Sequence, residues 1–333
     1  MLNNLNILFL ILTMVSSIFA ISTFSWFSAW MGLELNLLSF VPLLIEQKNS
    51  SSNESALKYF LVQAMASSLF ITLSLMNTFS FFSFSIFDYQ NFNLLMIPLI
   101  IKLGAAPFHP WFITLMNKLN WYKAFLLATW QKIAPLCIFN YLNLNMNLVM
   151  SIAFLSLFVG AIGGLTQTMM QKILAFSSVS HLGWLLTTTL LSKQILSIYF
   201  IMYMLMNMLL FTFLYYNNIF HFNQNLSQTQ LLCFSIGLLS LSGLPPFIGF
   251  LPKWMVVQNL ILSKYLILSF ILIAATLITL IFYIRLILNF SLLLSSSPKW
   301  FIWQTKSNLK MSKLLTFLTV SSMLGLMMFN FIF

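Results

Sequence analysis

Four ionisable residues lie inside long apolar runs of the sequence: Glu34, Lys102, Lys132 and Lys253. Lys102 is about ten residues into its run, or roughly 15 Å along a helix that rises 1.5 Å per residue. A charge at the centre of a bilayer costs at least about 3 kcal/mol. Such side chains are therefore expected to pair with an opposite charge, to meet internal water or to exchange protons. For each of them, the alternative is a structural ion pair or a long side chain that reaches the interface.

Two of these lysines are close to glycine and proline residues that interrupt the apolar run. The first stretch reads IKLGAAPFHPW and contains Lys102, and the second, LSGLPPFIGFLPKW, contains Lys253. Proline lacks a backbone N–H, so it leaves helix carbonyls unpaired. In lipid, such breaks are tolerated only where they are buried in protein or line a watery cavity. Paired interruptions in the two halves of a chain are typical of inverted-repeat transporters, although kinks that serve packing alone would look similar.

Two histidines are candidates for proton exchange near neutral pH, because imidazole both accepts and donates protons there. His109 follows the first interruption. His181 lies in the middle of an apolar segment, close to several serines. A structural role as hydrogen-bonded histidines is an equal alternative for both.

The composition places these residues in a membrane protein. The chain is 60% hydrophobic and only 6% charged, whereas soluble domains have about 25% charged residues. The net charge of +11 indicates basic loops and does not require nucleic acid as a partner. Cys137 and Cys233 both fall in apolar segments, which favours small core residues. The sequence shows no metal-binding cluster and no glycine-rich nucleotide loop, so no cofactor or metal is expected on this chain.

Apolar segments predict an all-α polytopic membrane protein with about eleven transmembrane helices in a single transmembrane domain, residues 1–333. The predicted segments are 3–22, 25–45, 56–80, 91–117, 122–141, 146–168, 170–190, 193–216, 228–258, 262–291 and 312–333. Residues 292–333 are expected to form an amphipathic connection, centred on 295–313, and the C-terminal helix.

Lysines are distributed unequally between the two sides of these segments. The side opposite the N-terminus has only Lys193 and Lys264. The N-terminal side collects Lys48, Lys58, Lys118, Lys123, Lys172, Lys299, Lys306, Lys310 and Lys313. This asymmetry predicts that the N-terminus faces the inner compartment. Arg285 is near the end of its segment and is expected to reach the interface by snorkelling.

Five motifs together resemble a known family. They are WMGLELNLLSF, KLGAAPFHPW, WQKIAPL, SVSHLGW and SGLPPFIGFLPKW. They are similar to the antiporter-like subunits of the membrane arm of mitochondrial NADH–ubiquinone oxidoreductase (respiratory complex I), and within them to subunit 2. The resemblance covers essentially the whole chain, with the motifs in the family's order, and length and composition resemble arthropod members.

The resemblance implies two inverted five-helix repeats, each with a broken helix. The first would span 25–141 with its break near 102–110, and the second 146–291 with its break near 242–253. It also implies that Glu34 pairs with Lys102, that Lys132 is the central relay lysine, and that Lys253 is the terminal one, toward a neighbouring subunit.

The resulting hypothesis is proton translocation across the mitochondrial inner membrane, coupled to quinone reduction in other subunits. Loss of the Glu34 interaction would let Lys102 release its proton through water toward Lys132 and Lys253. By resemblance, FMN, iron–sulfur clusters and ubiquinone belong to other subunits. The expected partners are other membrane-arm subunits and inner-membrane lipids such as cardiolipin, with the N-terminus in the matrix. A free-standing cation/proton antiporter and a passive assembly scaffold are the alternatives.

Overall fold

A computed structural model describes residues 4–46, 49–82, 93–142, 145–222, 224 and 226–296 of the chain. Within them the fold is helical, with one isolated β-bridge between Met169 and His221. The chain divides into two compact units, 1–152 and 153–333, and each is described by itself. The predicted C-terminal helix, 312–333, and most of the connection before it lie outside the described residues.

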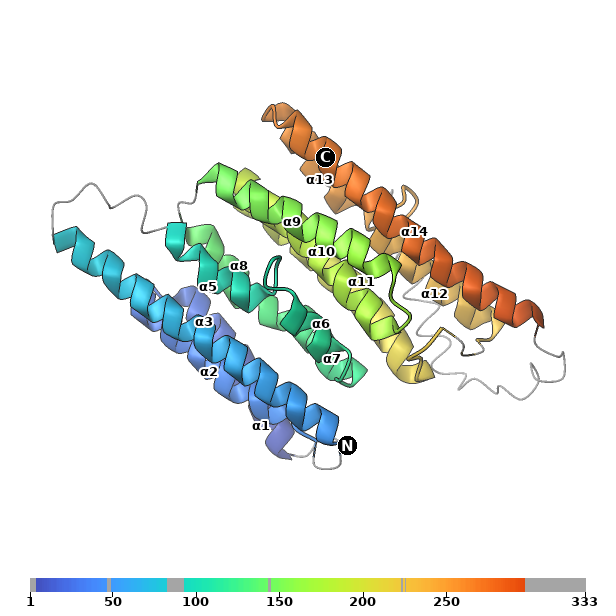
Figure 1. The fold of residues 1–333 in the computed structure, drawn as a ribbon, viewed down its shortest axis with the longest axis horizontal. Helices are drawn as coiled ribbons and strands as arrows, with labels where there is room; N and C mark the ends of the chain where they lie inside the picture. The colour runs from blue at the N-terminus through green and yellow to red at the C-terminus, as the bar shows by residue number, and fades with distance from the viewer. Residues whose placement is uncertain are drawn as a thin grey trace. The chain divides into compact units, whose positions relative to one another are not determined.

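The first unit is a set of long helices packed against shorter ones (Figure 1). Its helices are α1 (Asn4–Ser22), α2 (Trp26–Leu44), α3 (Ser50–Phe82), α5 (Met96–Leu103), α6 (Pro110–Met116), α7 (Trp121–Ala128) and α8 (Trp130–Tyr141). Helix α2 packs between α1 and α3, while α5 packs against both α3 and α8. Helix α5 is thus held in place by α3 and α8, and α8 packs in addition against α1 and α7.

Helix α1 shows how this unit is suited to lipid. Its buried residues are small or hydroxyl-bearing, including Thr13, Ser16 and Ser17. Large apolar side chains such as Leu12 and Ile18 are exposed. The three hydroxyls donate to carbonyls three residues earlier in the same helix, so their hydrogen-bonding needs are met within α1. Small residues facing neighbouring helices and apolar residues facing outward are typical of membrane helices.

The second unit is organised around one central helix (Figure 1). Its helices are α10 (Met170–Leu191), α11 (Lys193–Asn217), α12 (Gln228–Ser242), α13 (Phe250–Leu262) and α14 (Leu266–Ser296), together with most of α9 (Met146–Leu165). Helix α10 packs against α11, α13 and α14. In the apolar 18-residue stretch of α10, 89% is buried, which is the highest share among the candidate membrane spans in the described residues.

The described helices account for ten of the predicted segments. Seven helices there are long and apolar enough to cross a membrane. The segments 91–117 and 228–258 are each interrupted near the predicted position, as α5–α6 and α12–α13. A count of eleven stays a prediction, because segment 312–333 is outside the described residues.

Two boundaries differ from the predicted ones. Segment 122–141 is predicted to be continuous, but it is divided at Thr129, whose backbone N–H and hydroxyl both donate to the Phe125 carbonyl, at 3.0 and 2.7 Å. Pro135 further weakens the following turn, because it cannot donate to the residue four positions back. Helix α3 begins at Ser50 and not at residue 56, since its first turns extend beyond the apolar part of the segment.

Candidate functional site

Lys102 lies in the last turn of α5, immediately before the first interruption. The helix ends because Gly104 adopts a left-handed conformation, with φ of 69°. Its N–H donates to the carbonyls of Ile100 and Ile101, at 3.0 and 3.1 Å. A Cβ atom at this position would also lie 3.0 Å from Cβ of Phe112. Glycine is therefore required here both for the turn and for the close return of the chain.

Neutral side chains from two other helices complete the end of α5. The indole of Trp111, on α6, donates to the Ile101 carbonyl at 3.1 Å. The amide of Gln63, on α3, donates to the backbone carbonyl of Lys102 at 3.3 Å. The amino group of Lys102 is not needed for this purpose. Within the described residues it makes no hydrogen bond and no ion pair closer than 4.0 Å.

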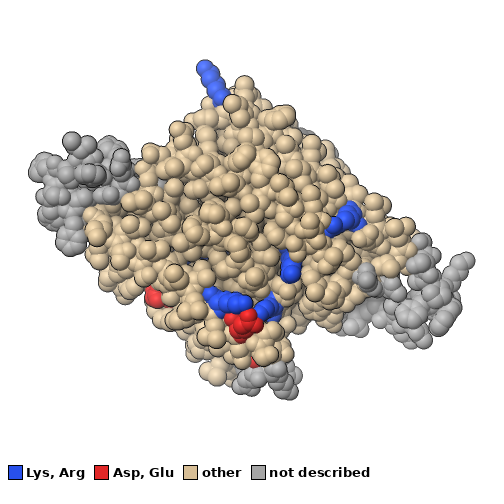
Figure 2. All heavy atoms as spheres, in the orientation of Figure 1, with Lys and Arg blue, Asp and Glu red and all other residues tan. Residues whose placement is uncertain are grey.

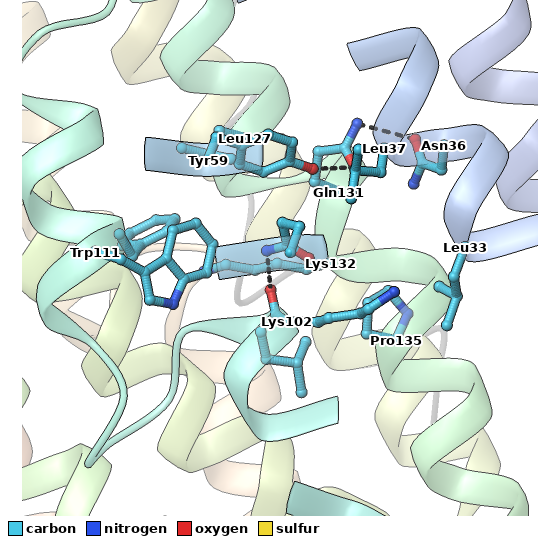
Figure 3. A pocket seen from close by; sticks show the side chains of 13 residues that line it. Leu33, Asn36, Leu37, Tyr59, Lys102, Trp111, Leu127, Gln131, Lys132 and Pro135 are labelled. Atoms are coloured by element: carbon cyan, nitrogen blue, oxygen red, sulfur yellow. Dashed lines mark hydrogen bonds between the residues drawn. The ribbon is translucent and has the colours of Figure 1, made fainter. Parts of the chain in front are cut away.

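A small polar cavity lies between α2, α3, α5, α6, α7 and α8 (Figure 3). Its volume is about 20 Å³, and a water molecule needs about 10–15 Å³. Lys102 and Lys132 both line it. At one side Gln131 donates to Asn36 at 3.1 Å and accepts from Tyr59 at 3.4 Å. The cavity therefore has room for water together with polar groups to hold it.

Lys132 reaches this cavity from α8. Only 2% of Lys132 and 7% of Lys102 is exposed to solvent. The Lys132 amino group lies 4.9 Å from the centre of the Phe112 ring, a favourable cation–π distance. Two charged lysines at one small buried site would repel each other, so the number of protons that the pair holds is a shared property of the two residues.

The resemblance predicts that Glu34 pairs with Lys102, and the structure shows no such ion pair. The two side chains form no ion pair within 4.0 Å, although the carboxylate is near enough for a favourable Coulomb interaction. Leu33 and Leu37 of the same helix line the cavity, whereas Glu34 does not. Glu34 is about 100° around α2 from Leu33, so it occupies an adjacent face. Its Oε2 atom is buried and has no hydrogen-bond partner among the described residues.

His109 is separate from the cavity. It precedes α6, is partly exposed, and its Nδ1 atom donates to the Pro107 carbonyl at 3.2 Å. The structure brings together Lys102 and Lys132 in the first unit, with Glu34 beside them, but not His109.

Lys253 lies in the first turn of α13, after the second interruption. Its side chain turns back toward the end of α12, and its amino group donates to the carbonyls of Leu241 and Ser242 at 2.9 and 2.8 Å. The same group lies 5.8 Å from the centre of the Trp184 ring. Lys253 is 8% exposed, so these contacts replace solvent.

His181 belongs to the same unit and is buried on α10. Its Nδ1 atom lies 3.0 Å from the Tyr199 hydroxyl. Tyr199 stacks on Trp184, with ring planes 13° apart, and Trp184 in turn faces Lys253. Sequence reasoning did not identify Tyr199 or Trp184, because with 17% aromatic residues no single ring stands out.

Arg285 reaches the end of helix α9, and its snorkelling to the interface stays a prediction. Its guanidinium group donates to the carbonyls of Leu165 and Gln167, the latter at 2.8 Å. It thus satisfies the C-terminal end of α9, where helix carbonyls lack partners. The residue therefore serves helix packing in the second unit.

Comparisons with known proteins agree with these features. Residues 23–279 match the family described as NADH:quinone oxidoreductase/Mrp antiporter, transmembrane. NADH-ubiquinone oxidoreductase chain 2 of Anopheles gambiae is 41% identical, with 98% of each chain covered. The Mus musculus protein of that name is 37% identical, with 84% of each covered. Insect members are among these relatives, as length and composition predicted.

A chain of respiratory complex I from Thermus thermophilus has the same fold, with a TM-score of 0.80 at 22% identity. The similarity covers 97% of this chain and 78% of that one. A chain of the Mrp complex from Dietzia sp. matches with a TM-score of 0.75 at 17% identity, over 84% of this chain and 59% of that one. The chain belongs to the NADH:quinone oxidoreductase/Mrp antiporter transmembrane family and, within it, to the family of NADH-ubiquinone oxidoreductase chain 2.

Proposed function

We propose that this chain is a proton-translocating core subunit in the membrane arm of an NADH–ubiquinone oxidoreductase. The observation that carries the proposal is the water-sized cavity lined by Lys102 and Lys132 beside an interrupted helix. The assignment to this enzyme complex is supported by the names of the relatives, and the proton transfer is supported by the cavity. Other subunits would hold the flavin, the iron–sulfur clusters and the quinone.

The proposed transfer uses one water in the cavity. A charged Lys102 gives a proton to this water, which passes another of its protons to a neutral Lys132. Movement of the Glu34 charge changes how strongly Lys102 holds its proton, because Glu34 acts through space and not through a fixed ion pair. Lys253 in the second unit would be a later member of the relay, and His181 is a further candidate there.

The location follows from the lysine distribution and from the relatives. We propose that the chain spans the mitochondrial inner membrane with its N-terminus in the matrix. Its partners would be other subunits of the membrane arm and the surrounding lipids, including cardiolipin.

The test is Lys102→Met in the assembled complex, reconstituted in sealed vesicles. The variant keeps the bulk of the side chain but cannot carry a proton, so quinone-linked proton translocation should fall on the order of tenfold or more. The matched control is Lys58→Met, since Lys58 is 46% exposed in a surface ion pair with Glu54. Unchanged translocation by Lys102→Met, with the complex intact, would exclude the relay and favour a scaffold.

A second candidate is a free-standing cation/proton antiporter, favoured by the structural match to the Mrp complex chain. It predicts exchange of cations for protons by the purified chain alone in vesicles. The complex I proposal predicts no such exchange without the other subunits.

A further inference from the structure

The carbonyls at the two helix interruptions accept hydrogen bonds from different kinds of donor. At the end of α5, the freed carbonyls accept from backbone N–H groups, from Trp111 and from Gln63. At the end of α12, Lys253 itself donates to the last two carbonyls, those of Leu241 and Ser242. Lys102 thus faces a cavity, whereas Lys253 is part of the interruption between α12 and α13, which we call the joint.

The sequence explains why α12 needs this donor. In a continuing helix, the carbonyls of Leu241 and Ser242 would accept from the N–H groups of residues 245 and 246. Both of these residues are proline and have no N–H. Gly243 and Leu244 donate instead to the carbonyls of Leu239 and Ser240, at 3.1–3.4 Å. Among the described residues, Lys253 is therefore the donor recorded for the last two carbonyls of α12.

Gly243 makes room for this contact. It ends α12 in a left-handed conformation, with φ of 78°. A Cβ atom there would lie 2.7 Å from Cδ and 3.2 Å from Cε of Lys253. The stem of the lysine therefore crosses directly over the glycine, which acts as a positioning residue for the amino group. On another side, the ring of Trp184 faces the same amino group.

We propose that the charged amino group of Lys253 fastens the interruption between α12 and α13, so that this joint loosens when Lys253 loses its proton. The negative end of the α12 dipole, two carbonyls and an aromatic face all interact more strongly with an ammonium ion than with a neutral amine. Whether the joint opens during turnover rests on the proposed function, but the fastening itself does not.

The experiment compares amide hydrogen exchange in assembled complexes with Lys253→Met, Lys253→Gln or Lys253→Arg. Gly243, Leu244 and Phe247 are the reporters, because their N–H groups bond within the joint. Arginine keeps a charged donor, glutamine a neutral donor, and methionine no donor. Exchange at the reporters should be about tenfold or more faster with methionine, intermediate with glutamine and nearly unchanged with arginine.

Lys102→Met is the matched control, read at Gly104 and Ala105 of the other interruption. Their exchange should stay unchanged, because Gln63 and Trp111 close that joint. Unchanged exchange at Gly243 in Lys253→Met, or equal loosening of both joints by the two methionine variants, overturns the proposal. If Lys253→Met does not assemble, equal protection in the glutamine and arginine variants overturns it.

Proton translocation measured on the same samples separates this inference from the proposed function. A loosened joint with normal translocation would support the fastening and remove Lys253 from the relay. Slow exchange at the joint together with lost translocation would overturn the fastening and keep Lys253 in the relay.

Discussion

At the scale of single residues, the account depends on two lysines that share one cavity. Lys102 and Lys132 are both buried, and both line a space for about one water. Desolvation and mutual repulsion each disfavour the state in which both are charged. A proton added to one of them therefore favours loss from the other. This coupling is what a relay requires, and a permanent ion pair would remove it.

Lys132→Arg tests this coupling, because arginine keeps its charge at every accessible pH. A permanent charge in the cavity should stop proton exchange, so translocation in the assembled complex should fall on the order of tenfold or more, as it should in Lys132→Met. Reconstituted vesicles with a pH-sensitive dye provide the measurement. Wild-type translocation by the arginine variant would show that Lys132 does not need to lose its proton.

At the scale of helices, the interruption of α5–α6 is held by a neighbouring element. Gln63 on α3 donates to the Lys102 carbonyl, and Trp111 on α6 donates to the Ile101 carbonyl. Helix α3 is therefore part of the site although it contributes no lysine and no carboxylate to the cavity. Its amide fixes the direction in which the end of α5, and with it Lys102, points.

Gln63→Leu should loosen this interruption while leaving every lysine in place. It leaves a buried carbonyl without its donor, which costs about 1–3 kcal/mol. Amide exchange at Gly104 and Ala105 should rise accordingly, with slower proton translocation. The control on the same helix is Ser68→Ala, because Ser68 is exposed and its hydroxyl donates to the Met65 carbonyl within α3. Equal exchange in both variants would contradict the role of Gln63.

Features of the helices that depend on local sequence were predictable, and those that depend on neighbours were not. Gly104 and Gly243 end their helices where the sequence indicated, because glycine and proline act on the backbone around them. The burial of the lysines also followed from the apolar runs. The face on which Glu34 lies and the acceptors of Lys253 depend on which helix packs alongside. The interruption at Thr129 had no proline or glycine to signal it.

At the scale of the whole molecule, charged residues are scarce, at 6% of the chain. Figure 2 shows acidic and basic side chains together at one place on a largely uncharged face. Glu54 binds both Lys58 and Lys118, with each nitrogen–oxygen distance 2.5 Å. The Glu54–Lys118 pair ties the start of α3 to the segment between α6 and α7, whereas the Glu54–Lys58 pair lies within α3. All these lysines belong to the predicted inner side of the membrane.

Orientation can be tested with a membrane-impermeant amine reagent on sealed vesicles of both orientations, followed by mass spectrometry. Lys58 should react only when the matrix face is outside, and Lys264, which is exposed, only when the opposite face is outside. Reaction of both lysines from the same side would contradict the predicted topology.

The most direct test of the central claim is an experimental map of the intact complex at a resolution that shows ordered water. The account predicts water in the cavity between Lys102 and Lys132, within hydrogen-bond distance of at least one of the two amino groups. A dry cavity, with each lysine held by its own permanent opposite charge, would contradict it.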